Sequence, residues 1–247
     1  MDDLRGKVVV VTGGSRGLGR EMVRAYAAHG ADVVIASRKL DACEALADEV
    51  AGLHGVRAVP LACNVSDWDD CDALVERVYE ELGRVDVLVN NAGLSPLYPS
   101  LEEVTEALWD KVVAVNLKGP FRLSATIGAR MTADGGGAIL NISSVASLRP
   151  DAISLPYAAA KAGLNALTEG FAQALGPTVR VNGIICGPFE TDIARAWPEE
   201  IRTMVEDQIA LRRVGRPEEV VGAALYLTSD ASTYTTGALL RLDGGTR

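Results

Sequence analysis

The sequence predicts a single α/β domain with a doubly wound parallel sheet of seven strands and helices on both faces. Short runs of Val, Ile, Leu and Ala alternate with segments of helical periodicity along all 247 residues. The runs are apolar at successive positions, as in strands buried on both faces of a parallel sheet. The length suits one large α/β domain, and no internal repeat or linker divides residues 1–247.

The elements of the first half follow from local signals. The strand Lys7–Thr12 leads through a glycine-rich turn into a helix ending near His29, where Gly30 is a C-terminal stop signal. Asp67 is a suitable N-cap for a helix over Asp67–Leu82. The other elements expected in this half are strands at Asp32–Ala36, Arg57–Ala62 and Val85–Val89, and a long helical stretch over Leu101–Thr132.

The second half continues the alternation. Three strands and two helices are expected there, at Ala138–Ile142, Tyr157–Leu175, Val179–Ile185, Pro217–Thr228 and Ala238–Leu242. Pro217 opens its helix at a position where proline is favoured. Gly187–Arg216 is the least regular segment, and a loop of this length is often a lid over a substrate site.

Composition excludes several classes of protein. The net charge of −9 repels phosphate backbones, so no nucleic-acid partner is expected. The four cysteines form no C-x-x-C pair and the two histidines stand apart, so no metal site is expected. The start of the chain is polar and its apolar runs are short. We therefore expect a cytoplasmic protein with reduced thiols and no membrane partner.

The turn Thr12–Gly19 has the chemistry of a nucleotide-binding loop. Its glycines, Gly13, Gly17 and Gly19, permit positive φ and close approach of the backbone to a ligand. The helix that follows offers free N–H groups and a positive dipole end to a pyrophosphate. Such a turn can also serve only to pack a strand on a helix. Its place between the first strand and the first helix favours nucleotide binding.

Tyr157 and Lys161 share one face of a predicted helix, because they are four positions apart. A phenol with a pKa near 10 is a poor base at neutral pH, and a nearby ammonium lowers that pKa. The pair could therefore move a proton at an alcohol or carbonyl oxygen. Alone, it fits equally well an exposed Tyr and Lys on a helix surface.

With its other motifs, the sequence resembles the short-chain dehydrogenase/reductase family over its full length, which implies a Rossmann-type fold and a nicotinamide cofactor. The motifs occur in the family's order: Thr12–Gly19, Asn64-Val65, Asn90–Gly93, Asn116, Ser143-Ser144, Tyr157 with Lys161, Gly187–Thr191 and Leu242–Gly245. The overall sequence is similar to 3-oxoacyl-carrier-protein reductases and to gluconate or glucose dehydrogenases.

The resemblance implies catalytic roles for four residues. Tyr157 would give a proton to a carbonyl or take one from an alcohol, and Lys161 would lower its pKa and bind the nicotinamide ribose. Ser144 would hydrogen-bond the reacting oxygen, with Ser143 as a competitor whose expected role is structural. Asn116 would hold a water that links Lys161 to solvent.

The resemblance also implies the cofactor contacts. They are Gly13, Ser15, Arg16, Gly17, Leu18, Gly19, Ser37, Arg38, Asn64, Val65, Asn91, Ala92, Gly93, Gly187, Phe189 and Thr191, together with Tyr157 and Lys161. Asn90 is expected instead to pin the central strands together. Many relatives have Asp where this chain has Asn64, and Asn can still pair with the adenine amino group.

The predicted coenzyme is NADP(H). An NAD-selective site places Asp or Glu at the end of the second strand, where it binds the ribose hydroxyls and repels a 2′-phosphate. Here Ser37, Arg38 and Lys39 occupy that place. Arg38 offers a planar guanidinium to phosphate, and Arg16 approaches from the glycine turn. The alternative is that both arginines are merely solvated.

The substrate is expected to be a small secondary alcohol or carbonyl compound. Carrier-protein reductases generally place Arg or Lys where this chain has Thr132–Gly137 and Gly176–Thr178, which contain none. A free alcohol, sugar or hydroxy acid is therefore at least as consistent. Arg149 and Arg195 could meet a substrate carboxylate, although solvation is the simpler expectation for both.

Three further expectations remain open. Relatives read Pro-Gly where this chain has Cys186-Gly187, and Cys186 fits a small buried residue better than a reactive thiol. A non-catalytic nucleotide-binding protein on the same fold is an alternative, although the proton-transfer set favours an enzyme. The resemblance also implies a homotetramer, with interfaces at Leu101–Thr132 with Tyr157–Leu175 and at Pro217–Leu242.

Overall fold

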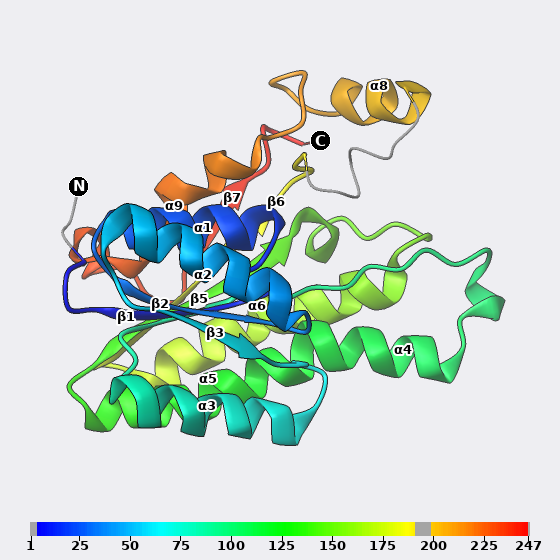
Figure 1. Cartoon of the computed structure of the whole chain (residues 1–247). Helices are drawn as coiled ribbons and strands as arrows, with labels where there is room; N and C mark the ends of the chain where they lie inside the picture. The colour runs from blue at the N-terminus through cyan, green and yellow to red at the C-terminus, as the bar shows by residue number, and fades with distance from the viewer. Residues whose placement is uncertain (1–3, 191–198, 247) are drawn as a thin grey trace.

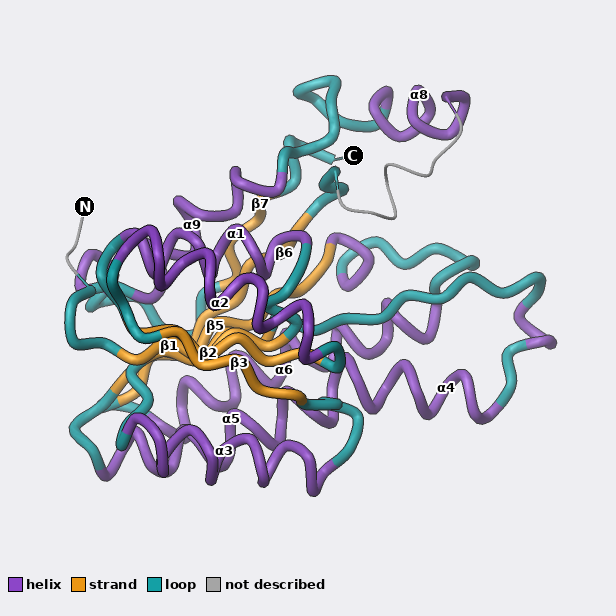
Figure 2. Tube along the Cα trace, in the orientation of Figure 1, coloured by secondary structure: helices purple, strands orange, loops and turns teal. Residues whose placement is uncertain are grey.

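A computed structural model describes residues 4–190 and 199–246. Its centre is a seven-stranded sheet in the order β3-β2-β1-β4-β5-β6-β7, and every neighbouring pair is parallel. Figures 1 and 2 show helices packed on both faces of this sheet. The predicted doubly wound α/β fold in a single domain is therefore confirmed.

Each strand begins and ends within two residues of its expected bounds. They are β1 Val8–Thr12, β2 Asp32–Ser37, β3 Ala58–Ala62, β4 Val87–Asn90, β5 Gly137–Ser144, β6 Val179–Cys186 and β7 Leu239–Leu242. The main helices are α1 Gly17–Ala28, α2 Leu40–His54, α3 Trp68–Leu82, α4 Glu106–Val113, α5 Gly119–Ala133, α6 Leu155–Leu175, α8 Glu199–Asp207 and α9 Val221–Thr228.

Two helical segments differ from the sequence-based expectation. No helix was expected at α2, although its buried residues Cys43, Leu46, Ala47 and Val50 have helical spacing. The stretch expected to be one helix over Leu101–Thr132 is divided instead. A short 3-10 turn precedes α4, and a π-helical turn at Ala114–Lys118 joins α4 to α5.

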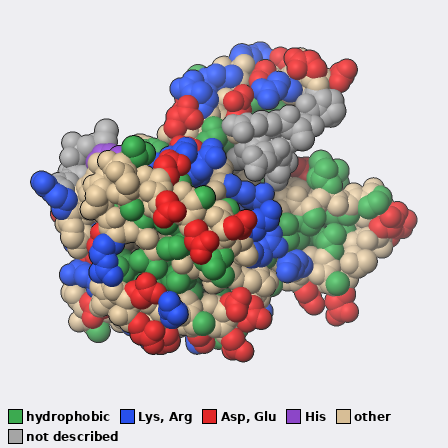
Figure 3. Space-filling view, viewed as in Figure 1, with side chains coloured by type: hydrophobic (Ala, Val, Ile, Leu, Met, Phe, Trp, Pro, Cys, Tyr) green, Lys and Arg blue, Asp and Glu red, His purple; other side chains and the backbone are tan. Residues whose placement is uncertain are grey.

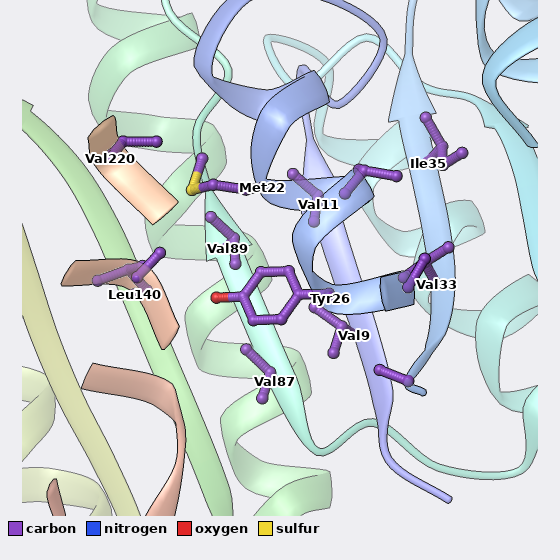
Figure 4. Close-up of a cluster of buried hydrophobic side chains, with 14 of the residues drawn as sticks. Val9, Val11, Met22, Tyr26, Val33, Ile35, Val87, Val89, Leu140 and Val220 are labelled. Carbon is purple, nitrogen blue, oxygen red and sulfur yellow. The ribbon is translucent and has the colours of Figure 1, made fainter. Parts of the chain in front are cut away.

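Two apolar layers enclose the sheet and explain its apolar strands. Val9 and Val11 of β1 belong to the cluster that includes Met22 and Tyr26 of α1, which Figure 4 shows in close-up. Val10, between them, belongs to the opposite cluster. Successive strand residues point to opposite faces, so both must be apolar when helices cover both sides.

The strand order places a topological switch between β1 and β4. From β1 the chain builds β2 and β3 on one side, and it then returns to build β4 to β7 on the other. In such sheets the ligand crevice lies at the carboxyl ends of the strands beside the switch. The turn after β1 and the segment after β4 therefore meet at the expected cofactor edge.

Among the described helices, none is both long and apolar enough to cross a membrane.

Candidate active site

The glycine turn after β1 is closed too tightly for side chains. Gly13 and Gly17 have φ of +62° and +54°, in the left-handed region that favours glycine. A Cβ on Gly19 would lie 2.3 Å from the carbonyl oxygen of Gly13 and 2.5 Å from Nδ2 of Asn91. The turn and the start of α1 thus bring backbone N–H groups to the switch, where they could bind a pyrophosphate.

The segment after β4 holds this turn in place. Asn91 donates from Nδ2 to the carbonyl oxygens of Thr12, at 2.9 Å, and Gly13, at 3.1 Å. The Thr12 hydroxyl accepts from the backbone N–H groups of Asn91 and Ala92 and donates to the carbonyl of Val89. The side-chain amide of Asn91 is therefore already hydrogen-bonded to the glycine turn. The backbone of Asn91 and Ala92 remains to line a cofactor.

Asn90 joins the centre of the sheet to the helices below it. Its Nδ2 donates to Oδ1 of Asn141 at 2.9 Å and to the hydroxyl of Ser124 at 3.0 Å. Asn141 continues the network to Thr168 on α6 at 2.9 Å. This arrangement confirms that Asn90 pins the central strands.

The adenosine side of the crevice contains no acid at the end of β2. The Ser37 hydroxyl contacts Oγ of Ser15 at 3.0 Å and Sγ of Cys43 at 3.1 Å, which ties the glycine turn to α2. Arg38 follows and is exposed, and Arg16 precedes α1 with an extended backbone. Figure 3 shows Lys and Arg side chains gathered between the main body and the lobe that carries α8.

Asn64 and Val65 form a compact turn after β3. Oδ1 of Asn64 accepts from the hydroxyl of Ser66 at 2.8 Å, so this oxygen already has a partner. Val65 is buried against the start of α5, where a Cβ on Gly119 would come within 2.1 Å of the Val65 carbonyl oxygen. The turn is therefore fixed to α5 by a contact that only glycine allows.

The Tyr157–Lys161 pair comes from the first turns of α6. Lys161 is only 3% exposed, and its Nζ donates to the carbonyl oxygen of Ile142 in β5 at 2.7 Å. The same nitrogen lies 5.7 Å from the centroid of the Tyr157 ring. Ser144 is the last residue of β5 and is in register with Cys186, the last residue of β6. Both therefore lie at the carboxyl edge of the sheet.

Burial dominates the ionisation of this pair. It raises the pKa of Tyr157 to about 12, although the hydrogen bond from Ser144 acts in the opposite direction. It lowers the pKa of Lys161 to about 8. The net pKa of Tyr157 is therefore raised, because burial disfavours the phenolate, and a lowering of this pKa by Lys161 stays a prediction.

The two adjacent serines differ in their surroundings. The Ser143 hydroxyl is buried and donates to Oδ1 of Asn165 at 2.6 Å, which confirms a structural role. The Ser144 hydroxyl accepts a 3.2 Å bond from the N–H of Ala146, and the residue is partly exposed. Ser144 is thus the serine that can meet a reacting oxygen.

Asn116 lies in the π-helical turn and is fully buried. Its Nδ2 donates to the carbonyls of Leu94 at 2.7 Å and Val112 at 2.9 Å, and its Oδ1 accepts from the N–H of Leu94 at 3.2 Å. A Cβ on Gly93 would lie 3.4 Å from this Oδ1 and 3.9 Å from Nζ of Lys161. The structure therefore brings Asn116, Gly93 and Lys161 together, and π-turns recur at functional sites.

Beyond β6 the site is closed by small and apolar residues. Cys186 is buried, and burial raises the pKa of its thiol to about 12, so it is neutral and fits a packing role. A Cβ on Gly187 would meet Asp243 at 2.7 Å, and Phe189 packs against Gly215. The candidate residues Thr191 and Arg195 lie outside the described residues.

Two features of the site had no signal in the sequence. The Tyr98 hydroxyl donates to the carbonyl of Ala152 at 2.7 Å and accepts from the N–H of Leu155 at 2.8 Å, at the start of α6. A cavity of about 270 Å³ begins at Val145 and Ala146, directly after Ser144. Its lining comes from the segments that follow β5 and β6, from α8 and the residues after it, from β7 and from the residues after β7, which no motif connects.

No group of three or more His, Cys, Asp or Glu side chains in residues 4–190 and 199–246 could hold a metal ion.

Comparison with known proteins gives consistent matches along the chain. A family model described as Enoyl-(Acyl carrier protein) reductase matches residues 13–247. The chain is 37% identical over 243 residues to 3-oxoacyl-[acyl-carrier-protein] reductase FabG of Thermotoga maritima, covering 98% of each chain. It is 38% identical over 247 residues to L-rhamnose 1-dehydrogenase (NAD(P)(+)) of Azotobacter vinelandii, covering 97% of this chain and 96% of that protein.

A solved structure matches the fold of the chain over nearly its full length. The crystal structure of a blue fluorescent protein from a metagenomic library, in complex with NADPH, superposes with a TM-score of 0.93. The two chains are 34% identical, and the match covers 99% of each.

Proposed function

The chain belongs to the short-chain dehydrogenase/reductase family of oxidoreductases, and on that premise we propose that it is an NADP(H)-dependent enzyme acting on a secondary alcohol or ketone. The observation that carries this proposal is the convergence of Tyr157, Lys161 and Ser144 at the carboxyl edge of the sheet. The glycine turn that could hold the dinucleotide lies at the same edge.

In this proposal the bound nicotinamide supplies a hydride to the carbonyl carbon, or accepts one from the alcohol. Tyr157 donates the proton to the carbonyl oxygen in the reduction and takes it back in the oxidation. Ser144 donates a hydrogen bond to the same oxygen. Lys161, held by the carbonyl of Ile142, binds the ribose and connects through Asn116 to solvent. A ketone and NADPH thus give an alcohol and NADP⁺, with one proton taken up.

The coenzyme preference rests on the end of β2. Ser37 and Arg38 replace the acid that would bind the adenosine ribose of NAD, and Arg38 is exposed where it could reach a 2′-phosphate. The structural neighbour in complex with NADPH supports this choice. We expect a higher kcat/KM with NADPH than with NADH. Ser37→Asp with Arg38→Ala should shift the preference toward NADH, and a parent that prefers NADH by about tenfold would overturn the assignment.

A second candidate is reduction of a 3-oxoacyl group on a carrier protein, which the FabG relative of Thermotoga maritima favours. The segments Thr132–Gly137 and Gly176–Thr178 offer no basic residue to an acidic carrier. Arg130, just before the first segment, is ion-paired with Glu76 and stacked on Tyr79. Rates on a carrier-bound thioester and on the same acyl group as a free acid separate the two functions.

Turnover itself tests whether the protein is an enzyme. Purified protein with NADPH and a panel of ketones, quinones and sugars should give a loss of absorbance by NADPH. Binding of NADPH without turnover of any compound would favour a non-catalytic nucleotide-binding protein.

The proposed assembly is a homotetramer. Large apolar side chains are exposed on the two segments that would form interfaces. They are Leu101, Trp109 and Phe121 near α4 and α5, and Tyr226, Tyr234 and Leu240 near α9 and β7. Figure 3 shows apolar side chains on the arm that carries α4. Light scattering at micromolar concentration should give the mass of four chains, and a monomer would refute this proposal.

The segment Gly187–Arg216 is the proposed substrate lid. Its described part includes α8, and Val205, Gln208 and Ile209 from this region line the cavity beyond Ser144. In hydrogen exchange, amides in α8 should become more protected when substrate analogue and coenzyme are both present. Equal protection with and without them would contradict a lid.

A further inference from the structure

The cavity beyond Ser144 combines an apolar wall with a charged rim. Val145, Leu148, Pro188 and Ile209 supply apolar surface, and the volume of about 270 Å³ suits a small molecule. Its polar lining is Arg149, Asp151, Gln208, Arg241 and Thr246. Because the lining starts at the residue after Ser144, one end of the cavity lies beside the proposed site of reduction.

Two of the three charged rim residues are already engaged, Arg241 in an ion pair and Asp151 in two hydrogen bonds at the start of α6. Arg241 forms an ion pair with Asp243, through Nε at 3.0 Å. Asp151 accepts at Oδ1 from the hydroxyl of Ser154 at 2.8 Å and from the N–H of Ile153 at 3.1 Å, next to the start of α6. These bonds direct its negative charge toward the positive end of the helix dipole.

Arg149 differs from both. Its Nη1 donates to the neutral carbonyl oxygen of Thr246 at 3.1 Å, and no ion pair to Arg149 occurs within the described part of the chain. The side chain is exposed at the rim. A guanidinium has five N–H donors in a planar fork that matches a carboxylate, so further donors of Arg149 remain for a ligand.

We propose that Arg149 selects substrates that carry a carboxylate, so that the enzyme acts on short-chain oxo acids and the corresponding hydroxy acids. This inference rests on the proposed function and names its substrate class. The carbonyl lies at the Ser144 and Tyr157 end, the short aliphatic part contacts Val145 and Ile209, and the carboxylate pairs with Arg149. A thioester substrate has no free carboxylate for this contact.

The experiment compares short 2-, 3- and 4-oxo acids with their own methyl esters, using NADPH and four proteins. These are the parent, Arg149→Gln, Arg149→Lys and the control Arg77→Gln, whose arginine is exposed on α3 away from the cavity. The parent should prefer at least one acid to its ester. Arg149→Gln should lower kcat/KM for that acid about 10- to 100-fold, mainly through KM, and leave the ester unchanged.

Arg149→Lys should recover part of the loss, because it restores charge without the fork. Arg77→Gln should match the parent on acids and esters alike. Equal rates of acid and ester in the parent, or unchanged kinetics in Arg149→Gln, would overturn the role of Arg149 while the oxidoreductase stands. If NADPH binds but no ketone of any class is reduced, the proposed function itself fails, which is a different result from the loss of acid selectivity.

Discussion

The glycine turn and the cavity beyond Ser144 lie on the same edge of the sheet but are built in different ways. The turn uses Gly13 to Gly19, a single short stretch, and Asn91 fixes it by two hydrogen bonds. The cavity takes its lining from the segments after β5 and β6, from α8 and from β7 and the residues after it, which are far apart in the chain. The turn presents its backbone to a ligand and is held from behind by the Asn91 side chain, whereas the cavity is lined by side chains.

This difference explains why the family can keep one coenzyme chemistry and vary its substrates. A backbone cradle depends on glycine and on the strand order, so few sequences form it. A wall of side chains changes with any of its residues, and the fold remains the same. The following experiments test how strictly function divides between the two regions.

The largest effect is expected at Tyr157. Tyr157→Phe removes the proposed proton donor and keeps the ring, so turnover should fall by about 10²- to 10⁴-fold or more. Binding of NADPH, measured by fluorescence titration, should be nearly unchanged. Activity within about threefold of the parent would remove Tyr157 from the proposed mechanism.

A side chain introduced into the glycine turn should weaken NADPH binding by a steric clash. In Gly19→Ala the new Cβ would lie 2.3 Å from the carbonyl oxygen of Gly13, so the turn must open. We expect the Kd for NADPH to rise about 10- to 100-fold, from a strain of about 1–3 kcal/mol. Gly52→Ala is the matched control, because no atom lies within 4 Å of its Cβ on α2. Equal affinities of the two variants would contradict the tight-turn argument.

The pH dependence should report Lys161. Its pKa is lowered to about 8, so its charge is present below that pH and lost above it. In the reduction, kcat/KM should therefore fall about tenfold per pH unit above 8, while Tyr157, with a pKa of about 12, remains protonated. A flat profile between pH 7 and 10 would argue against a role for the charge.

The lowered pKa of Lys161 also predicts that the free energy of unfolding depends on pH. Between pH 8 and 10 the unfolded chain binds more protons at Lys161 than the folded protein does, so the free energy of unfolding should rise with pH. Lys161→Met should remove this rise. Denaturant unfolding at several pH values measures both proteins.

The smallest effect is expected at Tyr98, which joins the segment after β4 to the start of α6. Tyr98→Phe leaves the carbonyl of Ala152 and the N–H of Leu155 without this partner, at a cost of about 1–3 kcal/mol. We expect a lower Tm and a decrease in kcat of a few fold, since Tyr157 lies on the same turn. Tyr79→Phe, at a tyrosine whose buried hydroxyl has no hydrogen-bond partner in the described part of the chain, is the control and should lower neither.

Much of the fold could be predicted because its signals are local. Each strand is an apolar run bounded by turn residues, and Gly30 or Asp67 stops or starts a helix at its own position. The helix α2 was missed, although the spacing of its buried residues was present in the sequence. The π-turn at Ala114–Lys118 could not be predicted, because it forms where Asn116 bonds to Leu94, a residue of another segment.

The candidate site also has a part that could be predicted from the sequence and a part that could not. Its motif residues were identified from the sequence, and the structure brings Tyr157, Lys161, Ser144, Asn116 and Gly93 to one edge. The sequence did not predict that the Asn91 amide holds the glycine turn. It also did not predict that a tyrosine distant in the chain supports α6, since a lone Tyr between two elements has no distinguishing pattern.

The sequence by itself determined the strands, most of the helices, the glycine turn and the residues of the proposed proton-transfer set. These depend on periodicity, backbone freedom and residue type, which act over a few neighbouring positions. The tertiary structure alone decided the direction of the pKa shifts of Tyr157 and Lys161 and the shape and charge of the cavity. The reason is that desolvation and cavity lining depend on which distant segments pack together, and the sheet order sets that packing.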